Sequence, residues 1–355
     1  MLALSTLLSL RESDLPESAR KLLSFTDNRQ DAALQSGHFA DFIQVSLLRH
    51  ALYRALVEAG DKGLTHAELP SAVFRALDLP FELYARNPHA LFLARDDAEE
   101  ALRKVLTYLL YFDQRRGWRI TAPNLEQCGL LVIRYRSLAD LCAHEEAWQG
   151  VHPALVTASP ATRMAVATTL LDYLRRSMCL AEPILTRAEQ ASLKARSQQH
   201  LLEPWAIDEG ERLVTAWFAF PRSRADNDKE SCLFLSGRSA FGRYLRRAKT
   251  WPEGTPPVDI AEAETLIQQL LDILEKAGLT RRVFEPPKGP AAYQVPSSAL
   301  LWCVGSGKPP APDPLRVTRA SSEPSLPNPY FGEYYRSTAG QAAGLRGAEH
   351  TAQVP

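Results

Sequence analysis

The chain has 355 residues, which predicts two to three domains, and its 45% hydrophobic and 23% charged residues are typical of globular proteins. This composition excludes a collagen, a coiled coil and a wholly disordered chain. The 41 basic residues balance the 41 acidic ones, which excludes a uniformly basic nucleic-acid coat protein but permits a local basic surface.

The N-terminal part predicts a strand that leads directly into a long helix. Residues 1–20 favour a helix and a polar turn. The apolar run KLLSFT at 21–26 then indicates a buried strand, which ends in a polar loop at 27–31. Apolar residues recur at helical spacing over 31–59, so we expect a helix there.

The next segment has the element order of a winged-helix module. Gly60 to Gly63 interrupts the first helix, and Thr65 with Glu68 forms a T-x-x-E capping box for a helix over 66–77. A third helix is expected over 97–115, followed by a short strand at 118–121. Three helices and a strand in this order favour a winged helix, although many small helical domains share the pattern.

The middle of the chain predicts two helices and a hairpin. Ser159-Pro160 is an N-cap followed by proline and opens a helix to about residue 178, and a capping box at Thr186 opens another to about 199. Residues 213–220 and 232–235 are rich in β-forming residues. The polar segment 222–230 between them predicts a hairpin.

The last third predicts a helix, two strands and irregular chain. Asp259 with Glu262 caps a helix over 260–277, and strands are expected at 283–284 and 293–295, which is the order of the second half of a winged helix. A Pro-rich linker follows at 305–329. The whole pattern predicts an α+β, predominantly α-helical fold.

The cysteines and the hydropathy pattern indicate in which cellular compartment the protein is expected. The five cysteines are Cys128, Cys142, Cys179, Cys232 and Cys303. None forms a C-x-x-C pair, so we expect no structural zinc site, and an odd, scattered set fits a reducing cytoplasm. The apolar first ten residues lack a signal peptide's basic region and cleavage site, and no run of 18 apolar residues is present. We therefore expect a cytoplasmic protein with no membrane partner.

Two short patterns are similar to nucleotide or metal motifs but are interpreted otherwise. Residues 305–308 read GSGK, yet a P-loop needs G-x-x-x-x-G-K-[ST], and Trp302 and Pro309 occupy the positions of its first glycine and its hydroxyl. Residues 96–99 read DDAE at the start of an amphipathic helix, where acidic side chains stabilise the helix dipole. We expect a loop at 305–308 and no metal site or catalytic residue in this chain.

A basic segment is the candidate nucleic-acid contact. Residues 222–249 hold eight Lys or Arg against three acidic residues. The core of this segment consists of Arg238, Arg243, Arg246, Arg247 and Lys249, with Phe241, Tyr244 and Trp251 among them. We expect a basic helix over 238–249, on which three of these arginines (243, 246 and 247) share one face. Such cations would contact phosphates, and the aromatic rings would stack on bases. The alternative is a solvated helix face with its aromatic side chains in the core.

The most specific pattern is LLSFTDNRQDAALQSGHFADF at 22–42. It resembles the motif that opens the second RecA-like domain in a branch of large bacterial superfamily 2 DEAD/DEAH-box helicases. Related enzymes carry a shorter S-D-S-R-Q-D-A form. This chain has Thr26 and Asn28 in place of the two serines and keeps the other positions, which are Asp27, Arg29, Gln30, Asp31 and Ala32. GAEHTAQV at 347–354 resembles the segment around a histidine that precedes the nucleic-acid-binding strand region, and NPYFGEYY at 328–335 and ALLW at 299–302 are also similar.

The resemblance implies an incomplete RecA-like α/β part with inserted winged-helix-like domains. The expected divisions are 1–45 (N-terminal helix and first RecA-like strand and helix), 46–210 (helical insertion with a winged-helix-like unit), 211–304 (α/β part with a second such unit) and 305–355 (Pro-rich linker and return to the RecA-like domain). It further implies that Asp27, Arg29 and Gln30 line or brace the cleft between the RecA-like domains. His350 and Thr351 would lie near the nucleic-acid path.

The resemblance also implies that important parts are missing. Helicases of this kind bind ATP and Mg²⁺ through a P-loop and an acidic box, and they carry a late Q-R-x-G-R motif, none of which this chain contains. We therefore expect a fragment of a helicase that is inactive alone and needs no cofactor itself. Its expected partners are nucleic acid, in the first instance DNA, and the missing helicase domains in the same or another chain. The alternative is a non-enzymatic winged-helix module that binds nucleic acid or protein.

Overall fold

The computed structural model describes residues 2–11, 13–16, 19–22, 29–115, 122–225, 231–285, 289–308, 310–316, 329–345 and 347. The fold is α+β and predominantly helical. The helices are α1 (Leu2–Arg11), α2 (Arg29–Ala59), α3 (Leu69–Leu77), α4 (Leu93–Asp113), α5 (Leu138–Ala143), α6 (Pro153–Val156), α7 (Pro160–Arg176), α8 (Arg187–His200), α9 (Ala240–Leu245), α10 (Ile260–Lys276) and α11 (Pro329–Glu333). The strands are β1 (Leu64–Thr65), β2 (Leu131–Tyr135), β3 (Leu180–Ala181), β4 (Phe218–Phe220), β5 (Cys232–Phe234), β6 (Arg281–Phe284), β7 (Ala292–Pro296) and β8 (Leu300–Val304).

Local capping signals place the long helices where the sequence predicts them. α10 begins with a complete capping box, in which the Asp259 carboxylate accepts from the Glu262 amide at 2.8 Å and the Glu262 carboxylate accepts from the Asp259 amide at 2.7 Å. The Ser159 hydroxyl likewise accepts from the Thr162 amide at the start of α7. Each cap satisfies a backbone N–H that has no partner within the helix.

The T-x-x-E pair forms its hydrogen bonds but does not begin a helix at residue 66. The Glu68 carboxylate accepts from both the amide and the hydroxyl of Thr65, at 3.0 and 2.8 Å. Thr65 belongs to β1, however, and the helix α3 begins only at Leu69. The prediction was wrong by one turn because the backbone of Thr65 is held extended by its pairing with Leu301 on β8.

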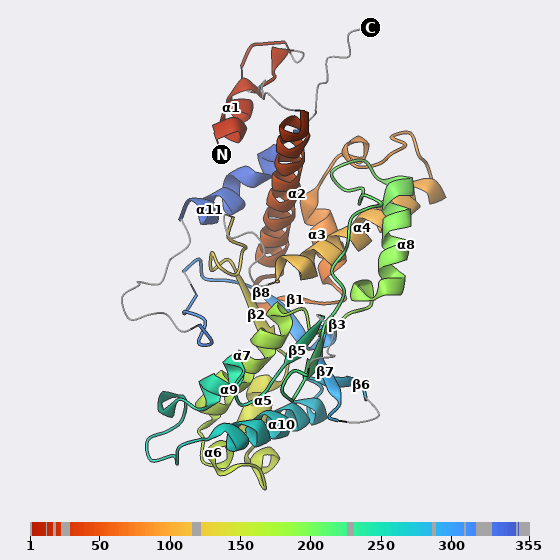
Figure 1. Cartoon of the computed structure of the whole chain (residues 1–355). Coiled ribbons are helices and arrows are strands. Elements are labelled where there is room, and N and C mark those ends of the chain that lie inside the picture. Colours follow the sequence, from red (N-terminus) through yellow and green to blue (C-terminus); the bar gives the residue numbers. More distant parts are fainter. Residues whose placement is uncertain are drawn as a thin grey trace.

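An antiparallel sheet of order β1-β8-β2 stands beside α2, α3 and α4. β8 is its central strand, so a late segment of the chain completes a sheet that the first 135 residues begin. The Trp302 side chain on β8 is fully buried and meets the Tyr111 ring edge-on, with centroids 5.9 Å apart. Residues 136–299 are thus inserted between two neighbouring strands. Much of this insertion forms the lower part in Figure 1, whereas α8 lies beside α4 in the upper part.

The second sheet has the order β3-β7-β4-β5, with β6 also paired to β7. The predicted hairpin of 213–220 with 232–235 was wrong, because β4 and β5 pair in parallel, with Phe218 opposite Cys232 and Phe220 opposite Phe234. A hairpin needs a short connection, whereas residues 221–231 are long enough to return the chain to the starting end of β4. The helix α10 lies against the face of the sheet that carries Tyr293.

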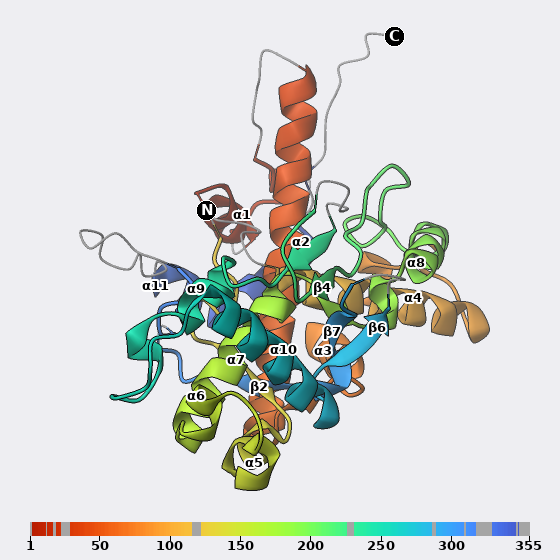
Figure 2. The ribbon, with the colours of Figure 1, turned by 60° about the horizontal axis from the view of Figure 1, so that its bottom comes forward.

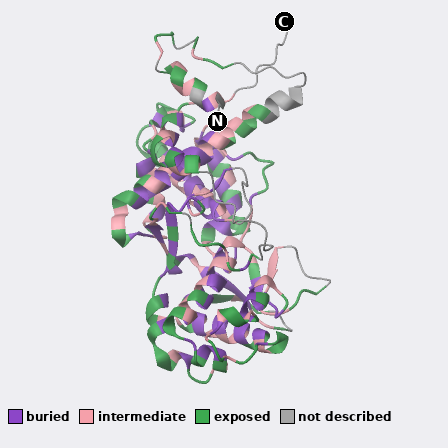
Figure 3. Cartoon of the chain, turned by 90° about the vertical axis from the view of Figure 1, so that its left-hand side faces the viewer, coloured by how far each residue is buried: buried purple, intermediate pink, exposed green. Residues whose placement is uncertain are grey.

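Both ends of the described chain lie near α2. The C-terminal helix α11, a π-helical turn at Tyr334–Thr338 and a 3₁₀ turn at Ala339–Ala342 run along α2. The Tyr334 ring stacks on the Phe42 ring with centroids 5.9 Å apart, and His50 Nδ1 hydrogen-bonds the Tyr335 carbonyl at 2.8 Å. Buried residues continue from these helices through the strands into the lower part (Figure 3). No helix in the described ranges is long and apolar enough to cross a membrane.

A buried arginine joins the upper elements. Arg49 on α2 is 1% exposed and forms a bidentate ion pair with Asp113 at the end of α4, at 2.6 and 3.0 Å. Its remaining donors reach the carbonyls of Ala122 and Pro123, both at 3.0 Å, and the Tyr335 hydroxyl at 2.7 Å. A charge this deeply buried is stable only when it is paired and its donors are satisfied. Arg49 therefore ties α2, α4, the 122–123 segment and the C-terminal segment together.

We expect Asp113→Asn to lower the free energy of unfolding by about 3–5 kcal/mol, because it leaves the Arg49 guanidinium buried without a counter-charge. Chemical denaturation monitored by circular dichroism measures this change. Glu100→Gln removes the half-exposed partner of Arg103 and serves as the control, with an expected loss of about 0.5 kcal/mol or less. Equal losses in the two variants would show that the buried pair has no special role.

Candidate nucleic-acid interface

The residues of the N-terminal match lie at the start of α2 or before it. Arg29, Gln30 and Asp31 form the first turn of α2, and their side chains lie outside the described set. Asp27 also lies outside the described residues, as does most of the predicted strand at 21–26, of which Lys21 and Leu22 are described and are not in a strand.

The C-terminal match approaches the same end of α2. His350 and Thr351 lie outside the described residues, but Gly347 at the start of this match is described. A Cβ atom on Gly347 would meet the Ser36 carbonyl at 2.8 Å and the Phe39 ring at 3.4 Å, so its backbone lies directly on α2. The two matches, separated by some 300 residues of chain, therefore approach each other along the N-terminal half of α2.

The GSGK sequence forms a loop that holds the end of β8. The amide of Gly305 donates to the Leu130 carbonyl and the amide of Gly307 donates to the Gly129 carbonyl, both at 2.9 Å. A phosphate cradle needs such amides to point at the ligand, and here two of them are used in backbone pairing. This segment therefore does not fit the phosphates of ATP.

The basic segment contains less helix than the sequence predicts. The helix α9 ends at Leu245, Arg246 is its C-cap, and Arg247 is extended, with φ −81° and ψ 126°. The expected continuous basic helix over 238–249 was therefore wrong. The reason is side-chain capping, because the Thr250 hydroxyl and the Trp251 indole donate to the carbonyls of Tyr244 and Leu245 and turn the chain away after one and a half turns.

The cations of this segment nevertheless lie on the surface. Arg238, Arg243, Arg246 and Lys249 are exposed and Arg247 is half-buried. The guanidinium groups donate to backbone carbonyls: Arg243 to Arg238 at 2.8 Å, Arg246 to Gly237 at 3.3 Å and Arg247 to Pro314 at 2.6 Å. Among the described residues, no carboxylate forms an ion pair with any of the five. Their charge is thus available to a phosphate.

The interleaved aromatic residues lie in the core and do not face a ligand. Phe241 is fully buried, and Tyr244 and Trp251 are less than a tenth exposed. Burial raises the pKa of Tyr244, as expected for a phenol removed from water. The alternative interpretation of these three side chains, that they anchor the segment to the core, is therefore correct, and base stacking by them is excluded.

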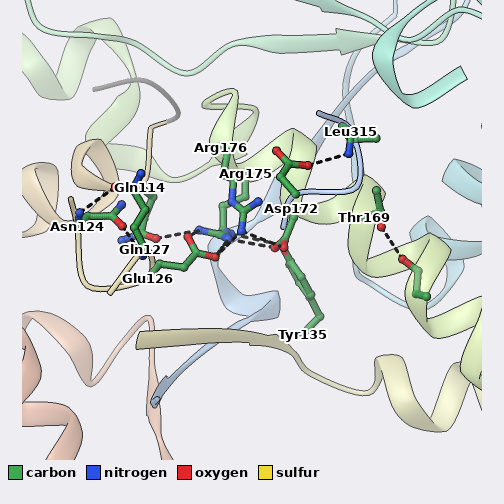
Figure 4. Close-up of polar contacts among 12 residues, drawn as sticks. Gln114, Asn124, Glu126, Gln127, Tyr135, Thr169, Asp172, Arg175, Arg176 and Leu315 are labelled. Atoms are coloured by element: carbon green, nitrogen blue, oxygen red, sulfur yellow. Dashed lines mark hydrogen bonds and ion pairs between the residues drawn. The ribbon is translucent and has the colours of Figure 1, made fainter. Parts of the chain in front are cut away.

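Buried arginines form a contrasting group whose charge is already neutralised (Figure 4). Arg175 on α7 is fully buried and contacts the Glu126 carboxylate at 2.7 Å, the Asp172 carboxylate at 3.0 Å and the Gln114 side-chain oxygen at 2.8 Å. The Tyr135 hydroxyl on β2 donates to the same Asp172 carboxylate at 2.8 Å. This cluster joins α4, β2 and α7, and thus the upper and lower parts of the molecule. It is structural and offers nothing to a ligand.

A cavity of about 600 Å³ opens between α2, α8 and the segment 202–208. Its walls are partly apolar, and its charged side chains are Arg86, Glu203 and Asp208. Leu345 and Gly347 also line it, so it lies where the two helicase-like matches approach each other. The mixed charge of the walls does not select one ligand class.

The described residues give little support for metal binding or for thiol chemistry. No three His, Cys, Asp or Glu side chains in the described ranges gather as a metal site. All five cysteines are free thiols. Burial raises the pKa of Cys128 and of Cys142 to about 11, so neither is a reactive thiolate at neutral pH.

We expect the stability contributed by Glu126 to disappear at low pH. Burial raises the pKa of Glu126, but Arg175 and Arg176 lower it further, to a net value of about 2 against an ordinary 4.5. A carboxyl group whose pKa is lower in the folded than in the unfolded chain stabilises the fold at pH values above its unfolded-state pKa. This contribution is lost as the pH falls from about 4.5 to 2. Glu126→Gln should therefore cost about 3 kcal/mol at pH 7 and progressively less below pH 4.5 in denaturation curves. A pH-independent difference would contradict this account.

Comparison with protein-family models, with curated proteins and with solved structures gives no match for this chain. What the chain does is therefore inferred from its residues and from the geometry in which the fold places them.

Proposed function

We propose that the chain is the central part of a superfamily 2 DEAD/DEAH-box helicase, consisting of the start of the second RecA-like domain and a long insertion. Its own role in that enzyme is to hold nucleic acid, in the first instance DNA, through the phosphates. The observation that carries this role is the group of surface cations Arg238, Arg243, Arg246, Arg247 and Lys249, which have no described carboxylate partner. In a chain of zero net charge, such a group is a local excess of positive charge.

The arrangement of the chain ends supports the idea of an insertion. A domain inserted into another needs its entry and exit close together, so that the host domain is not disrupted. Here α2 leaves the N-terminal match and the segment 329–342 returns along the same helix. Gly347 lies beside Ser36 on α2, and this closeness supports a return of the chain to the domain that it left.

The reaction of the parent enzyme requires residues that this chain does not supply. ATP hydrolysis needs a phosphate cradle, ligands for Mg²⁺ and an arginine that stabilises the transition-state charge. In the parent enzyme, hydrolysis of Mg²⁺-bound ATP would supply the energy for movement along nucleic acid. The residues of this chain bind and orient the nucleic acid through electrostatic contacts, and we expect no hydrolysis by the chain alone.

The alternative is a non-enzymatic winged-helix module, and one observation favours a protein partner for it. α2, α3 and α4 with the sheet β1-β8-β2 make a compact unit of three helices and three strands. Leu91, Phe92 and Leu93 at its tip are 66, 86 and 79% exposed. Asp96 and Asp97 follow at the exposed start of α4, where they would repel phosphates. This tip suits a protein surface better than nucleic acid.

We expect the basic segment to account for salt-dependent binding of DNA. A fluorescein-labelled 20-base-pair duplex is titrated with the full chain between 50 and 200 mM salt, and anisotropy gives the dissociation constant. Arg243→Glu combined with Arg246→Glu should weaken binding at least tenfold and reduce the slope of log K against log salt by about two units, because each lost phosphate contact removes about 0.9.

Arg187→Glu combined with Arg196→Glu is the matched control, since both arginines are exposed on α8 and the change in net charge is the same. It should leave the slope unchanged. Equal loss of affinity in the two double variants would mean that binding follows net charge alone and would refute a specific role for the basic segment.

We also expect the coding DNA on either side of this frame to encode the missing parts of the helicase. Translation of the flanking sequence, in frame or after a single shift, should give a P-loop upstream and a Q-R-x-G-R stretch downstream. Unrelated neighbours on both sides would remove the helicase part of the proposal and leave the winged-helix binding module as the better account.

A further inference from the structure

Three consecutive apolar side chains stand exposed where the chain enters α4. Leu91, Phe92 and Leu93 are 66, 86 and 79% exposed, which are the three highest values among the large hydrophobic residues of the described ranges. None of the three side chains packs against the hydrophobic core of these residues. Single exposed apolar residues are common, but a contiguous group is typical of a contact surface. We call Leu91, Phe92 and Leu93 the apolar tip.

The backbone of Phe92 has a conformation that favours glycine. Its φ is 50° and its ψ is −128°, and a bulky side chain at positive φ is uncommon and strained. Hydrogen bonds fix this turn on both sides. The Phe92 carbonyl accepts from the amides of Arg95 and Asp96 at 2.9 and 3.0 Å, and the Ala90 amide donates to the Asn87 carbonyl at 3.1 Å. Neither packing nor backbone geometry therefore explains an aromatic ring here, and strain of this kind is typical of binding sites.

The unpaired charges beside the apolar tip are negative. Asp96 and Asp97 are exposed near the start of α4, and neither carboxylate forms an ion pair or a hydrogen bond with a residue in the described ranges. The nearest cation along the helix, Arg95, is already paired with Glu99 at 3.2 Å. Arg86 in the preceding loop lines the cavity beside α2 and α8. A surface that receives the tip must therefore accept apolar side chains at its centre and supply cations at its rim.

A second copy of the tip does not meet these requirements. Two tips in contact would bring four unpaired aspartates together, and like charges across a contact oppose association. A stable flat interface also uses about 20–30 residues on each side, far more than the tip offers. A few side chains do contribute most of the binding energy when they enter a well-packed pocket. The aspartates would repel the phosphates of nucleic acid as well, so the suitable occupant is a pocket of another protein.

We propose that the apolar tip inserts into an apolar pocket of a different protein, whose rim carries Lys or Arg that pair with Asp96 and Asp97. Phe92 is the anchor, because it is the most exposed of the three and its turn is already fixed, so that little conformational freedom is lost on binding. This inference rests on the protein-binding alternative above for its kind of partner and not on binding of nucleic acid. The start of α4 lies on the other side of the molecule from α9, which carries part of the basic segment (Figures 1 and 2).

Photocrosslinking identifies the occupant. The photoreactive residue p-benzoylphenylalanine replaces Leu91 in the full chain, inside the cells that produce it, and ultraviolet light joins it to whatever it contacts. We expect one dominant product with a different protein, joined at an apolar residue that has Lys or Arg beside it. The same label at Val57, which is 52% exposed on α2, should not give this product. A product with a second copy or with lipid, or no product beyond that of the Val57 label, would overturn the proposal.

Calorimetric titration of the crosslinked protein, purified, with variants of the full chain then tests the contact. Phe92→Gly should weaken binding at least tenfold without lowering the melting temperature, because it removes the anchor while glycine suits this backbone. Asp96→Asn combined with Asp97→Asn should weaken binding about fivefold at 50 mM salt and less at 500 mM, because salt screens the rim charges. Val57→Ala is the control and should change nothing.

Unchanged affinity in Phe92→Gly overturns the tip as the contact. Duplex DNA binding should be the same with and without Phe92→Gly, because the tip and the basic segment are separate surfaces. Failure of this inference is thus distinguishable from failure of the nucleic-acid role, which the Arg243→Glu and Arg246→Glu variant tests by itself.

Discussion

The fold depends on the neutralisation of arginines that it buries. Arg49 and Arg175 are at most 1% exposed, and each meets carboxylates at 3.0 Å or less. An unpaired guanidinium at these depths would cost several kcal/mol, so the elements that supply the carboxylates must be in place for the core to form. For Arg49 this element is α4, and for Arg175 these elements are the segment around Glu126 and α7. The ion pairs thus require α2, α4, the segment around Glu126 and α7 to fold together, and the hydrogen bond from Arg49 to the Tyr335 hydroxyl adds the C-terminal segment.

Elements with a local signal could be predicted from the sequence, whereas those that depend on distant partners could not. The cap at Asp259 and the Ser159-Pro160 pair act within four residues of themselves, and α10 and α7 begin where they indicate. The parallel pairing of β4 with β5 depends on a crossover and on β7, which are far away in the sequence. Thr65 shows both effects, because its hydrogen bonds are local but its strand pairing with β8 delays the helix.

The candidate nucleic-acid interface could likewise be predicted only in part from the sequence. The excess of positive charge over 222–249 is visible in the sequence, and its cations are exposed as an interface would need. The sequence does not show that Phe241 and Trp251 turn inward, because a helix has both a buried and a solvated face. Nor does it show that the Phe218 and Phe284 rings meet, since they do so only through the pairings of β7. The alternation of side chains along one strand predicts which of its residues share a face. It does not predict which other strands lie beside it in the sheet.

The charged side chains discussed above fall into two groups, those that form ion pairs inside the fold and those that lie on the surface. The carboxylates of Asp113, Glu126 and Asp172 pair with arginines inside the fold. The cations of the basic segment, by contrast, have no carboxylate partner among the described residues. Because such pairs remove equal amounts of positive and negative charge, a positive surface on a chain of zero net charge comes from where the remaining charges lie. The basic segment suits phosphates because its cations are exposed and lack a described carboxylate partner.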